Sequence, residues 1–274
     1  MSSDILQIVR AALAEDIGSG DVTTQATVPE ATEAAGYFLA RERLVLAGTE
    51  VLQPIYDERG GAELELLHPN GAQLNEGDRF ANVRGKARTL LECERVALNF
   101  LQRLSGVATK AHRYVSAVEG TNCKVLDTRK TTPGLRRLEK AAAAAGGVTN
   151  HRMGLYDAIL IKNNHIAAAG GVRQAIESAR DKSTLPIEIE VRALDELHEA
   201  LDCGATHLLL DNLSPQQAEE WVRLIAGRAT VELSGRIDFD SVRNYAKTGA
   251  DFVSVGSITH SAPAKDIAFR LQLL

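Results

Sequence analysis

The feature that most constrains the fold is a regular alternation of short apolar runs and amphipathic segments, which starts near residue 124. The runs are rich in leucine and β-branched residues, and they read KVLDTR, AILIKNN, IEIEV, HLLLDN, TVELSG and FVSVGS. Apolar runs of this kind are typical of strands buried on both faces of a parallel sheet. Steps of about 20 to 30 residues fit the strand–helix unit of an α/β barrel. Six strong strands, fewer than a complete barrel has, predict an incomplete barrel.

The first half of the chain follows a different pattern. Residues 4–15 carry a helical stripe of apolar side chains, and residues 36–85 are strand-like and rich in turns, with a short helix expected near 51–56. A long helix is expected over residues 87–104, with a break at SGVAT before a second helix through 111–118. We expect these helices to join two domains.

Composition excludes several classes of protein. The 274 residues carry a formal net charge of −5, which argues against a general nucleic-acid binder, and 45% hydrophobic content suits a globular core. Neither a signal-peptide pattern nor an apolar run of membrane-spanning length is visible, so no membrane partner is expected. Cys93, Cys123 and Cys203 are scattered without metal-ligand spacing, which predicts free thiols in a reducing compartment, the cytoplasm.

Polar residues or glycines stand where each barrel strand ends. They are Asp127, Thr128, Arg129, Lys162, Glu190, Asp211, Ser234, Gly235, Gly256 and Ser257. In α/β barrels the active site forms at the carboxyl ends of the strands, so these groups should converge on one mouth. A single residue of this kind could equally be the N-cap of the next helix, and the functional interpretation depends on the whole series.

The cations of this region fall into two sets. Arg129, Arg152 and Lys162 lie near strand ends and could meet, and an arginine fork matches a carboxylate or phosphate in a bidentate way. Arg136, Arg137 and Lys140 lie on the following helix and are expected mostly at the surface. The predicted mouth is therefore basic although the chain is acidic.

Two further features describe what the mouth could bind. The motifs ELSGRI and VSVGSIT end consecutive strands, and backbone N–H groups at such ends make a phosphate cradle. Glu190 and Asp211 could bind a sugar diol, hold Mg²⁺ or stabilise a cationic transition state, or could simply pair with nearby cations. Together these features predict a site for a phosphorylated sugar and carboxylates, with transfer at an anomeric carbon.

The segments LDTRKTTPGLRRLEK and GGVTNHRMGLYDAILIKNNHI strongly resemble the nicotinate-nucleotide pyrophosphorylase family, also called quinolinate phosphoribosyltransferase. LAEDIGSGDVTT, ERVALNFLQRLSGVAT and the later strand ends resemble the same family in the right order. The resemblance covers nearly the whole chain. Three places depart from the family pattern: AAGGVTNHR has fewer glycines before its NHR, Asn163 replaces an acid, and Ala141 replaces an aromatic residue.

The resemblance implies an N-terminal open α/β sandwich, residues 1–105 with the interdomain helix, and a C-terminal incomplete α/β barrel, residues 106–274. It implies a homodimer in which one N-terminal domain caps the partner's barrel. The implied reaction is a pentosyl transfer that joins quinolinate to phosphoribosyl pyrophosphate with Mg²⁺. The products would be nicotinate mononucleotide, pyrophosphate and CO₂, a step of de novo NAD synthesis.

The resemblance also implies roles for particular residues. Arg129, Arg152 and Lys162, with His151 beside them, would hold the quinolinate carboxylates. Lys130 would meet pyrophosphate or a carboxylate, and Arg95 would reach across the dimer. Glu190 and Asp211 would face the ribose and the metal and would act in catalysis together with Lys130. The 5′-phosphate would lie against Ser234, Gly235, Arg236, Val255, Gly256 and Ser257, near Thr128.

Two alternatives remain open at this stage. One is a related phosphoribosyltransferase that acts on nicotinate or another heterocyclic acid. The other is a non-catalytic anion-binding relative, which would be expected to have lost Lys130, Glu190 or Asp211; all three are present.

Overall fold

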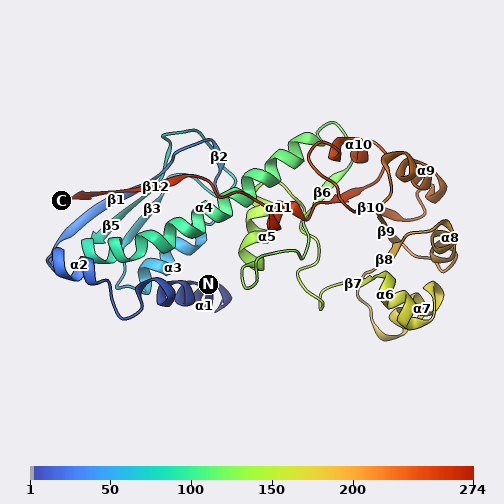
Figure 1. Ribbon diagram of the computed structural model, residues 1–274, viewed down its shortest axis with the longest axis horizontal. Helices are drawn as coiled ribbons and strands as arrows, with labels where there is room; N and C mark the ends of the chain where they lie inside the picture. Colours follow the sequence, from blue (N-terminus) through green and yellow to red (C-terminus); the bar gives the residue numbers. More distant parts are fainter. Residues whose placement is uncertain (1–2) are drawn as a thin grey trace. The chain divides into compact units, whose positions relative to one another are not determined.

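The computed structural model describes residues 3–274, which fall into two compact units (Figure 1). Unit 1 comprises Met1–His112, Thr132–Gly147 and Ser261–Leu274, and unit 2 comprises Arg113–Thr131 and Val148–His260. The helix α4 contributes residues to both units.

The elements assigned to unit 1 are α1 (Ser3–Ile17), α2 (Val22–Thr27), β1 (Glu33–Ala40), β2 (Leu44–Val45), η1 (Thr49–Val51), α3 (Leu52–Asp57), β3 (Glu63–Leu66), β4 (Gln73–Leu74), β5 (Arg79–Lys86), α4 (Ala87–Ala117), α5 (Arg136–Ala145) and β12 (Ile267–Leu273). Those of unit 2 are β6 (Lys124–Leu126), β7 (Ile159–Ile161), α6 (Asn163–Ala169), α7 (Val172–Lys182), β8 (Ile187–Val191), α8 (Leu194–Asp202), β9 (His207–Asp211), α9 (Pro215–Ile225), β10 (Thr230–Ser234), α10 (Val242–Ala246), β11 (Phe252–Ser254) and α11 (Ser257–His260).

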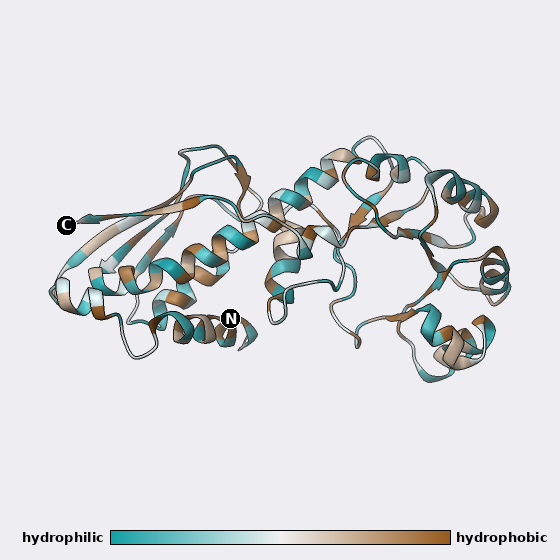
Figure 2. Cartoon of the chain, viewed as in Figure 1, coloured by the Kyte–Doolittle hydropathy of each residue, from teal (hydrophilic) through white to brown (hydrophobic). Residues whose placement is uncertain are grey.

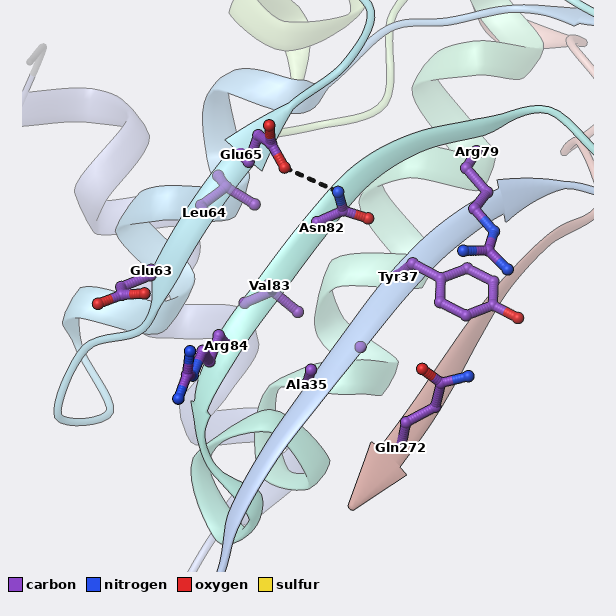
Figure 3. Close-up of a pocket in the computed structure, with 11 residues that line it drawn as sticks. Ala35, Tyr37, Glu63, Leu64, Glu65, Arg79, Asn82, Val83, Arg84 and Gln272 are labelled. Carbon is purple, nitrogen blue, oxygen red and sulfur yellow. Dashed lines mark hydrogen bonds between the residues drawn. The ribbon is translucent and has the colours of Figure 1, made fainter. Parts of the chain in front are cut away.

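Unit 1 is built on an antiparallel sheet of order β12-β1-β5-β3, with helices along one of its faces (Figure 1). Buried and half-buried residues alternate along β1, and Phe38 packs from its buried face against Phe80 and Phe269. The other face is open and polar, as Figure 3 shows: Glu65 accepts a hydrogen bond from Asn82, and the Arg79 guanidinium lies 3.7 Å from the centre of the Tyr37 ring. This arrangement is the open α/β sandwich expected for the N-terminal half.

The end of the chain does not stay with the barrel. We expected residues 106–274 to form one domain, but β12 pairs with β1 and α5 also falls in unit 1. The pairing gives β1 a second hydrogen-bonded neighbour and places Phe269 on Phe38, with ring centres 4.9 Å apart. Burial of this aromatic face explains why the terminal strand returns to the first sheet.

The helix α4 is continuous, whereas the sequence predicted a break at SGVAT. Ser105 is fully buried, and its hydroxyl donates to the Ala47 carbonyl and accepts from the Ala47 amide. A Cβ atom at Gly106 would lie 2.1 Å from the Pro263 carbonyl oxygen. The small residues Ser105 and Gly106 therefore allow other segments to pack closely against α4, and they do not end the helix.

Unit 2 contains a six-stranded sheet of order β6-β11-β10-β9-β8-β7, and every neighbouring pair in it is parallel. The edge strands β6 and β7 are not paired with each other, although a single bridge joins Leu126 to Thr149. Helices lie outside the sheet (Figure 1), and apolar strand segments and polar helix faces are distinct in colour in Figure 2. The prediction of an incomplete α/β barrel is confirmed.

Alternate strand residues face opposite sides of the sheet. Ile189, Leu208, Leu210 and Val253 are fully buried in the core. The alternating positions carry Glu188 and Glu190 on β8, and Glu232 and Ser234 on β10. In unit 2 the polar groups therefore occupy the side of the barrel sheet that leads to the expected site.

The helix ends of unit 2 follow common capping patterns. Ser214 caps α9 in a capping box with Gln217, and Pro215 is its first residue. Gly204 and Gly249 follow α8 and α10 with φ angles of 73° and 90°. Within the described residues, no helix has the length and apolar character needed to cross a membrane.

Candidate active site

The carboxyl ends of the parallel strands enclose a cavity of about 520 Å³ in unit 2. The predicted site residues that line it are Thr128, Lys130, Asp211, Ser234, Gly235, Arg236, Gly256 and Ser257. The structure thus brings together the ends of β6, β9, β10 and β11, as expected from the fold class.

One wall of this cavity is made by exposed backbone. Gly235 has φ of 104° and Arg236 φ of 51°, both in the left-handed region. A Cβ atom at Gly235 would lie 2.6 Å from the Asn212 amide nitrogen, and one at Gly256 would lie 2.9 Å from Cδ of Lys130. Glycine is required at position 235, where the neighbour is backbone, whereas the flexible Lys130 side chain could move away from position 256. Backbone amides in a wall of this kind suit an anion.

The loop after β6 is held by hydrogen bonds within the loop and from α11. The Lys130 amide donates to Oγ1 of Thr128 at 3.0 Å, and the Thr259 hydroxyl donates to the Lys130 carbonyl at 2.7 Å. Ser257 shares a hydrogen bond of 3.1 Å with the hydroxyl of Tyr114. The exposed Lys130 side chain therefore extends from an anchored backbone at the edge of the cavity.

The two acids of the mouth are ion-paired. The buried Glu190 accepts from Lys162 Nζ at 2.8 Å, and Nη2 of Arg192 lies 2.7 Å from its other oxygen. The same Nη2 is 3.1 Å from Asp211, which also accepts from the Asn212 side chain at 2.7 Å. The pairing with nearby cations that the sequence analysis named as one possibility for these acids is therefore present in the structure.

Arg192 was not among the residues expected in the site. Arg192 follows Glu190 by two positions in IEIEVRAL. This spacing could have predicted that it lies on the same side as Glu190, since residues two apart on a strand share a face. Its guanidinium joins the acids of two neighbouring strands, β8 and β9.

The expected Mg²⁺ can be tested against these donors. Carboxylate oxygens suit this hard cation, which usually keeps several waters and binds through one or two carboxylates plus substrate phosphates. Glu190 and Asp211 supply such oxygens and lie close enough to share Arg192. The pair fits Mg²⁺ provided that the guanidinium of Arg192 moves aside.

A second group of site residues is anchored by Asp127. This fully buried carboxylate accepts from the His151 amide at 2.8 Å and from the Asn150 side chain at 2.6 Å. These bonds tie the segment NHR to the end of β6, which explains how a loop residue such as Arg152 reaches the barrel.

Arg152 lies close enough to Arg129 for their charges to interact. Burial, and then the charge of Arg129, lower the pKa of Arg152 below its usual value. Nη1 of Arg152 donates to the Ala158 carbonyl at 2.9 Å. With His151, Arg152 lines a second cavity of about 280 Å³ that reaches the amino ends of β8, β9, β10 and β11, and it is not among the residues that line the cavity at their carboxyl ends. Two neighbouring, partly buried guanidinium groups are favourable for binding an anion with more than one carboxylate.

His151 contacts two carboxylates that the sequence analysis did not single out. Its Nε2 lies 3.2 Å from Glu188 and 3.4 Å from Glu232, and its Nδ1 accepts from the Arg152 amide at 2.7 Å. Burial opposes the charge on His151, but hydrogen bonds to Glu188 and Glu232 outweigh it and raise its pKa to about 9. Burial also raises the pKa of Glu188.

His151 and Glu188 interact strongly, so the extra proton belongs to their cluster. The Arg152 amide needs a lone pair on Nδ1, so the proton that the cluster retains at neutral pH lies on the side of Nε2 and the carboxylates. Glu188 and Glu232 were missed because single acids within a strand resemble ordinary solvent-facing residues.

The remaining expected residues are placed as follows. Val255 is buried next to Gly256, and Arg95 is an exposed residue of α4 in unit 1. Among the cations expected mostly at the surface, Arg137 is exposed, but Lys140 is fully buried in unit 1. Asn163 and Ala141, which depart from the family pattern, are both exposed.

Fold and site together define an α/β-barrel protein. Its mouth carries cations and backbone amides that suit anionic ligands, and two acids lie beside them. Comparison with family models matches residues 107–270 to the C-terminal domain of quinolinate phosphoribosyl transferase and residues 21–105 to its N-terminal domain. The chain belongs to the quinolinate phosphoribosyl transferase family.

Individual relatives agree with this assignment. The chain is 37% identical over 290 residues to a decarboxylating quinolinate phosphoribosyltransferase of Nicotiana tabacum, covering 98% of this chain and 82% of the relative. It is 38% identical over 262 residues to a probable nicotinate-nucleotide pyrophosphorylase of Bacillus subtilis, covering 94% and 90%. The crystal structure of NadC from Streptococcus pyogenes superposes with a TM-score of 0.94 at 41% identity, covering 98% and 97%.

Proposed function

We propose that this chain is a decarboxylating quinolinate phosphoribosyltransferase of NAD biosynthesis. The observation that carries the proposal is the cavity at the carboxyl ends of the strands, where Lys130, Asp211 and the glycine-containing ends of β10 and β11 meet, with Arg129 and Arg152 as a neighbouring pair of cations. The arginine pair suits a diacid and the cradle suits a sugar phosphate. Relatives that carry this name match the chain over nearly its whole length.

In the proposed reaction, the pyridine nitrogen of quinolinate forms a bond to the anomeric carbon while the bond from that carbon to pyrophosphate breaks. Positive charge develops on the sugar, and Glu190 and Asp211 lie at strand ends where they would stabilise it. The product pyridinium then accepts the electron pair released as the adjacent carboxylate leaves as CO₂, and that ring carbon takes up a proton.

The cations have separate proposed roles. Arg129, Arg152 and Lys162 would bind the carboxylates, with His151 beside them, and Lys130 would neutralise the departing pyrophosphate. Ser234 to Arg236 and Val255 to Ser257, near Thr128, would hold the 5′-phosphate. When bound, Mg²⁺ would add positive charge at the pyrophosphate, with Glu190 and Asp211 as its protein ligands.

A pyrophosphate-release assay with phosphoribosyl pyrophosphate and Mg²⁺ tests the proposal. Quinolinate should be turned over, while nicotinate, which has one carboxylate, should leave part of the cation cluster unpaired and react poorly. Comparable rates for both acids would favour the related transferase named above. Calorimetric binding of phosphoribosyl pyrophosphate without turnover of either acid would favour a non-catalytic relative.

We also propose a homodimer in which Arg95 enters the partner's site. The support is the resemblance to the family and the exposure of Arg95 on α4. Arg95→Ala homodimers should be impaired, and mixing them with an Arg152→Lys variant should restore part of the activity, because mixed dimers contain one intact site. Failure of this mixing to restore activity, although mixed dimers form, would contradict a shared site. A cytoplasmic location, expected from the scattered cysteines, stays a prediction.

A further inference from the structure

We propose that Glu188 and Glu232, which lie below the mouth inside the barrel, are positioning residues that orient His151 and Arg152 for binding the quinolinate carboxylates. This inference rests on the proposed function, because it concerns how the same site receives its acid substrate.

The placement of the two acids follows from strand geometry. Glu188 precedes Glu190 by two residues on β8, and Glu232 precedes Ser234 by two residues on β10. Residues two apart on a strand face the same side, so these acids form the layer below the mouth. Both line the cavity that also contains His151 and Arg152.

This layer is unusual for a barrel interior, which is normally filled by bulky branched side chains. The side chains of Glu188 and Glu232 are 17% and 5% exposed, and buried carboxylates are unfavourable unless they are hydrogen-bonded. The Ser254 hydroxyl donates to one oxygen of Glu232, and the other oxygen faces His151. The acids are therefore held by specific partners, which suggests a role beyond filling space.

The imidazole of His151 lies between this layer and the backbone of Arg152. Its Nε2 faces both carboxylates, and the Arg152 amide donates to its Nδ1 at 2.7 Å. The two bonds require different states of the ring nitrogens: Nε2 must carry a proton, and Nδ1 must keep a lone pair.

The carboxylates determine which tautomer is present. Two acceptors at Nε2 keep the proton there, so Nδ1 remains available to the Arg152 amide. Without them, the tautomer with a proton on Nδ1 would become accessible and would place a donor against the Arg152 N–H. The loop that carries the Arg152 guanidinium would then lose one of its anchors, although Asp127 would still hold the His151 amide.

The same three side chains also have the composition of a metal site, since their ligand atoms lie within 4.8 Å of one another. A metal at Nε2 would have to replace its proton, and the present distances fit hydrogen bonds from Nε2. The distances therefore favour hydrogen bonds from Nε2 over metal ligation at His151.

The test compares methionine and glutamine at each position in the full-length enzyme. Glu188→Met and Glu232→Met remove the acceptors, whereas Glu188→Gln and Glu232→Gln keep one acceptor oxygen. Leu208→Ala is the matched control, because Leu208 is a fully buried residue of β9 on the face of the sheet opposite Glu188 and Glu232, and its removal leaves a cavity without a lost side-chain hydrogen bond.

The wild-type enzyme is first shown to convert quinolinate; if it does not, the proposed function fails and this inference fails with it. With an active enzyme, the methionine variants should raise the KM for quinolinate about 10- to 100-fold and leave the KM for phosphoribosyl pyrophosphate unchanged. The glutamine variants should recover most of the loss. Leu208→Ala should lower the melting temperature without changing either KM.

Nitrogen NMR of ¹⁵N-histidine-labelled protein gives a second, independent measurement. The wild-type His151 should show a protonated Nε2 and a bare Nδ1, and the methionine variants should show a mixture of tautomers. The inference would be overturned by a wild-type proton on Nδ1, by equal effects on both KM values, or by glutamine variants as impaired as the methionine variants. Stoichiometric metal bound through His151 in purified protein would also overturn it.

Discussion

At the scale of single residues, arginine and lysine are not interchangeable at position 152. Arg152 is partly buried near Arg129, and its planar fork can bind a carboxylate with two parallel hydrogen bonds. Arg152→Lys keeps the charge but loses this geometry, so the KM for quinolinate should rise by about tenfold or more. Steady-state kinetics checks this, with Arg173→Lys on the exposed face of α7 as the control. Normal turnover of quinolinate by Arg152→Lys would show that Arg152 has another role.

Arg192 offers a second test at this scale, because its guanidinium lies on both acids of the mouth. Arg192→Ala removes a competing cation from Glu190 and Asp211. Calorimetry with Mg²⁺ should therefore show an affinity about two- to fivefold higher, which corresponds to about 0.4 to 1 kcal/mol, because Arg192 no longer competes for the two carboxylates. Arg173→Ala should leave Mg²⁺ affinity unchanged. Weaker binding in Arg192→Ala would indicate that Arg192 helps to build the cation site.

The His151 cluster predicts a pH effect on stability. The pKa of His151 in the folded protein is about 9, above the ordinary value of 6.5. Its contribution to the free energy of unfolding is therefore fully present below about pH 6.5. That contribution should be lost as the pH rises through about 9. Melting temperatures measured between pH 6 and 10 should fall more steeply for the wild type than for His151→Gln. Parallel curves for the two proteins would contradict a proton held by this cluster.

At the scale of elements, the strand ends could be predicted because a parallel barrel brings every carboxyl end to one side. The residues that were missed depend on contacts far away in the sequence. Gly106 resembles a helix breaker, yet α4 continues through it, and its missing side chain allows the close approach of Pro263. Lys140 resembles a surface lysine, yet it is fully buried. Local pattern therefore located the barrel and most of its mouth, and tertiary packing decided the rest.

The same element gives a stability prediction. Alanine is the better helix former by about 1 kcal/mol, so Gly106→Ala would stabilise an isolated helix. In this protein the added methyl group would meet the Pro263 carbonyl, and we expect a net loss of about 1 to 3 kcal/mol in the free energy of unfolding. Urea denaturation checks this, and Ser116→Ala on the same helix should change stability by less than about 0.5 kcal/mol. A stabilised Gly106→Ala protein would argue against close packing at this position.

At the scale of the whole molecule, an acidic chain with a formal net charge of −5 places both signs of charge at one set of strand ends, with Lys130 and Arg236 beside Asp211 and Asp238. Such a local arrangement offers separate places for the anionic and cationic parts of a small ligand without making the protein a general binder of polyanions. The C-terminal strand β12 lies in the sheet of unit 1, a pairing that the sequence alone did not indicate, because a single short alternating strand could join either sheet.

The central claim, that the barrel mouth receives a diacid beside a sugar phosphate, is tested most directly by a crystal structure of the enzyme with quinolinate. We predict that both carboxylates lie within hydrogen-bond distance of Arg129 and Arg152, with the ring nitrogen facing the cavity between Asp211 and Gly235. Quinolinate bound away from these arginines, or bound with its nitrogen turned from that cavity, would contradict the account.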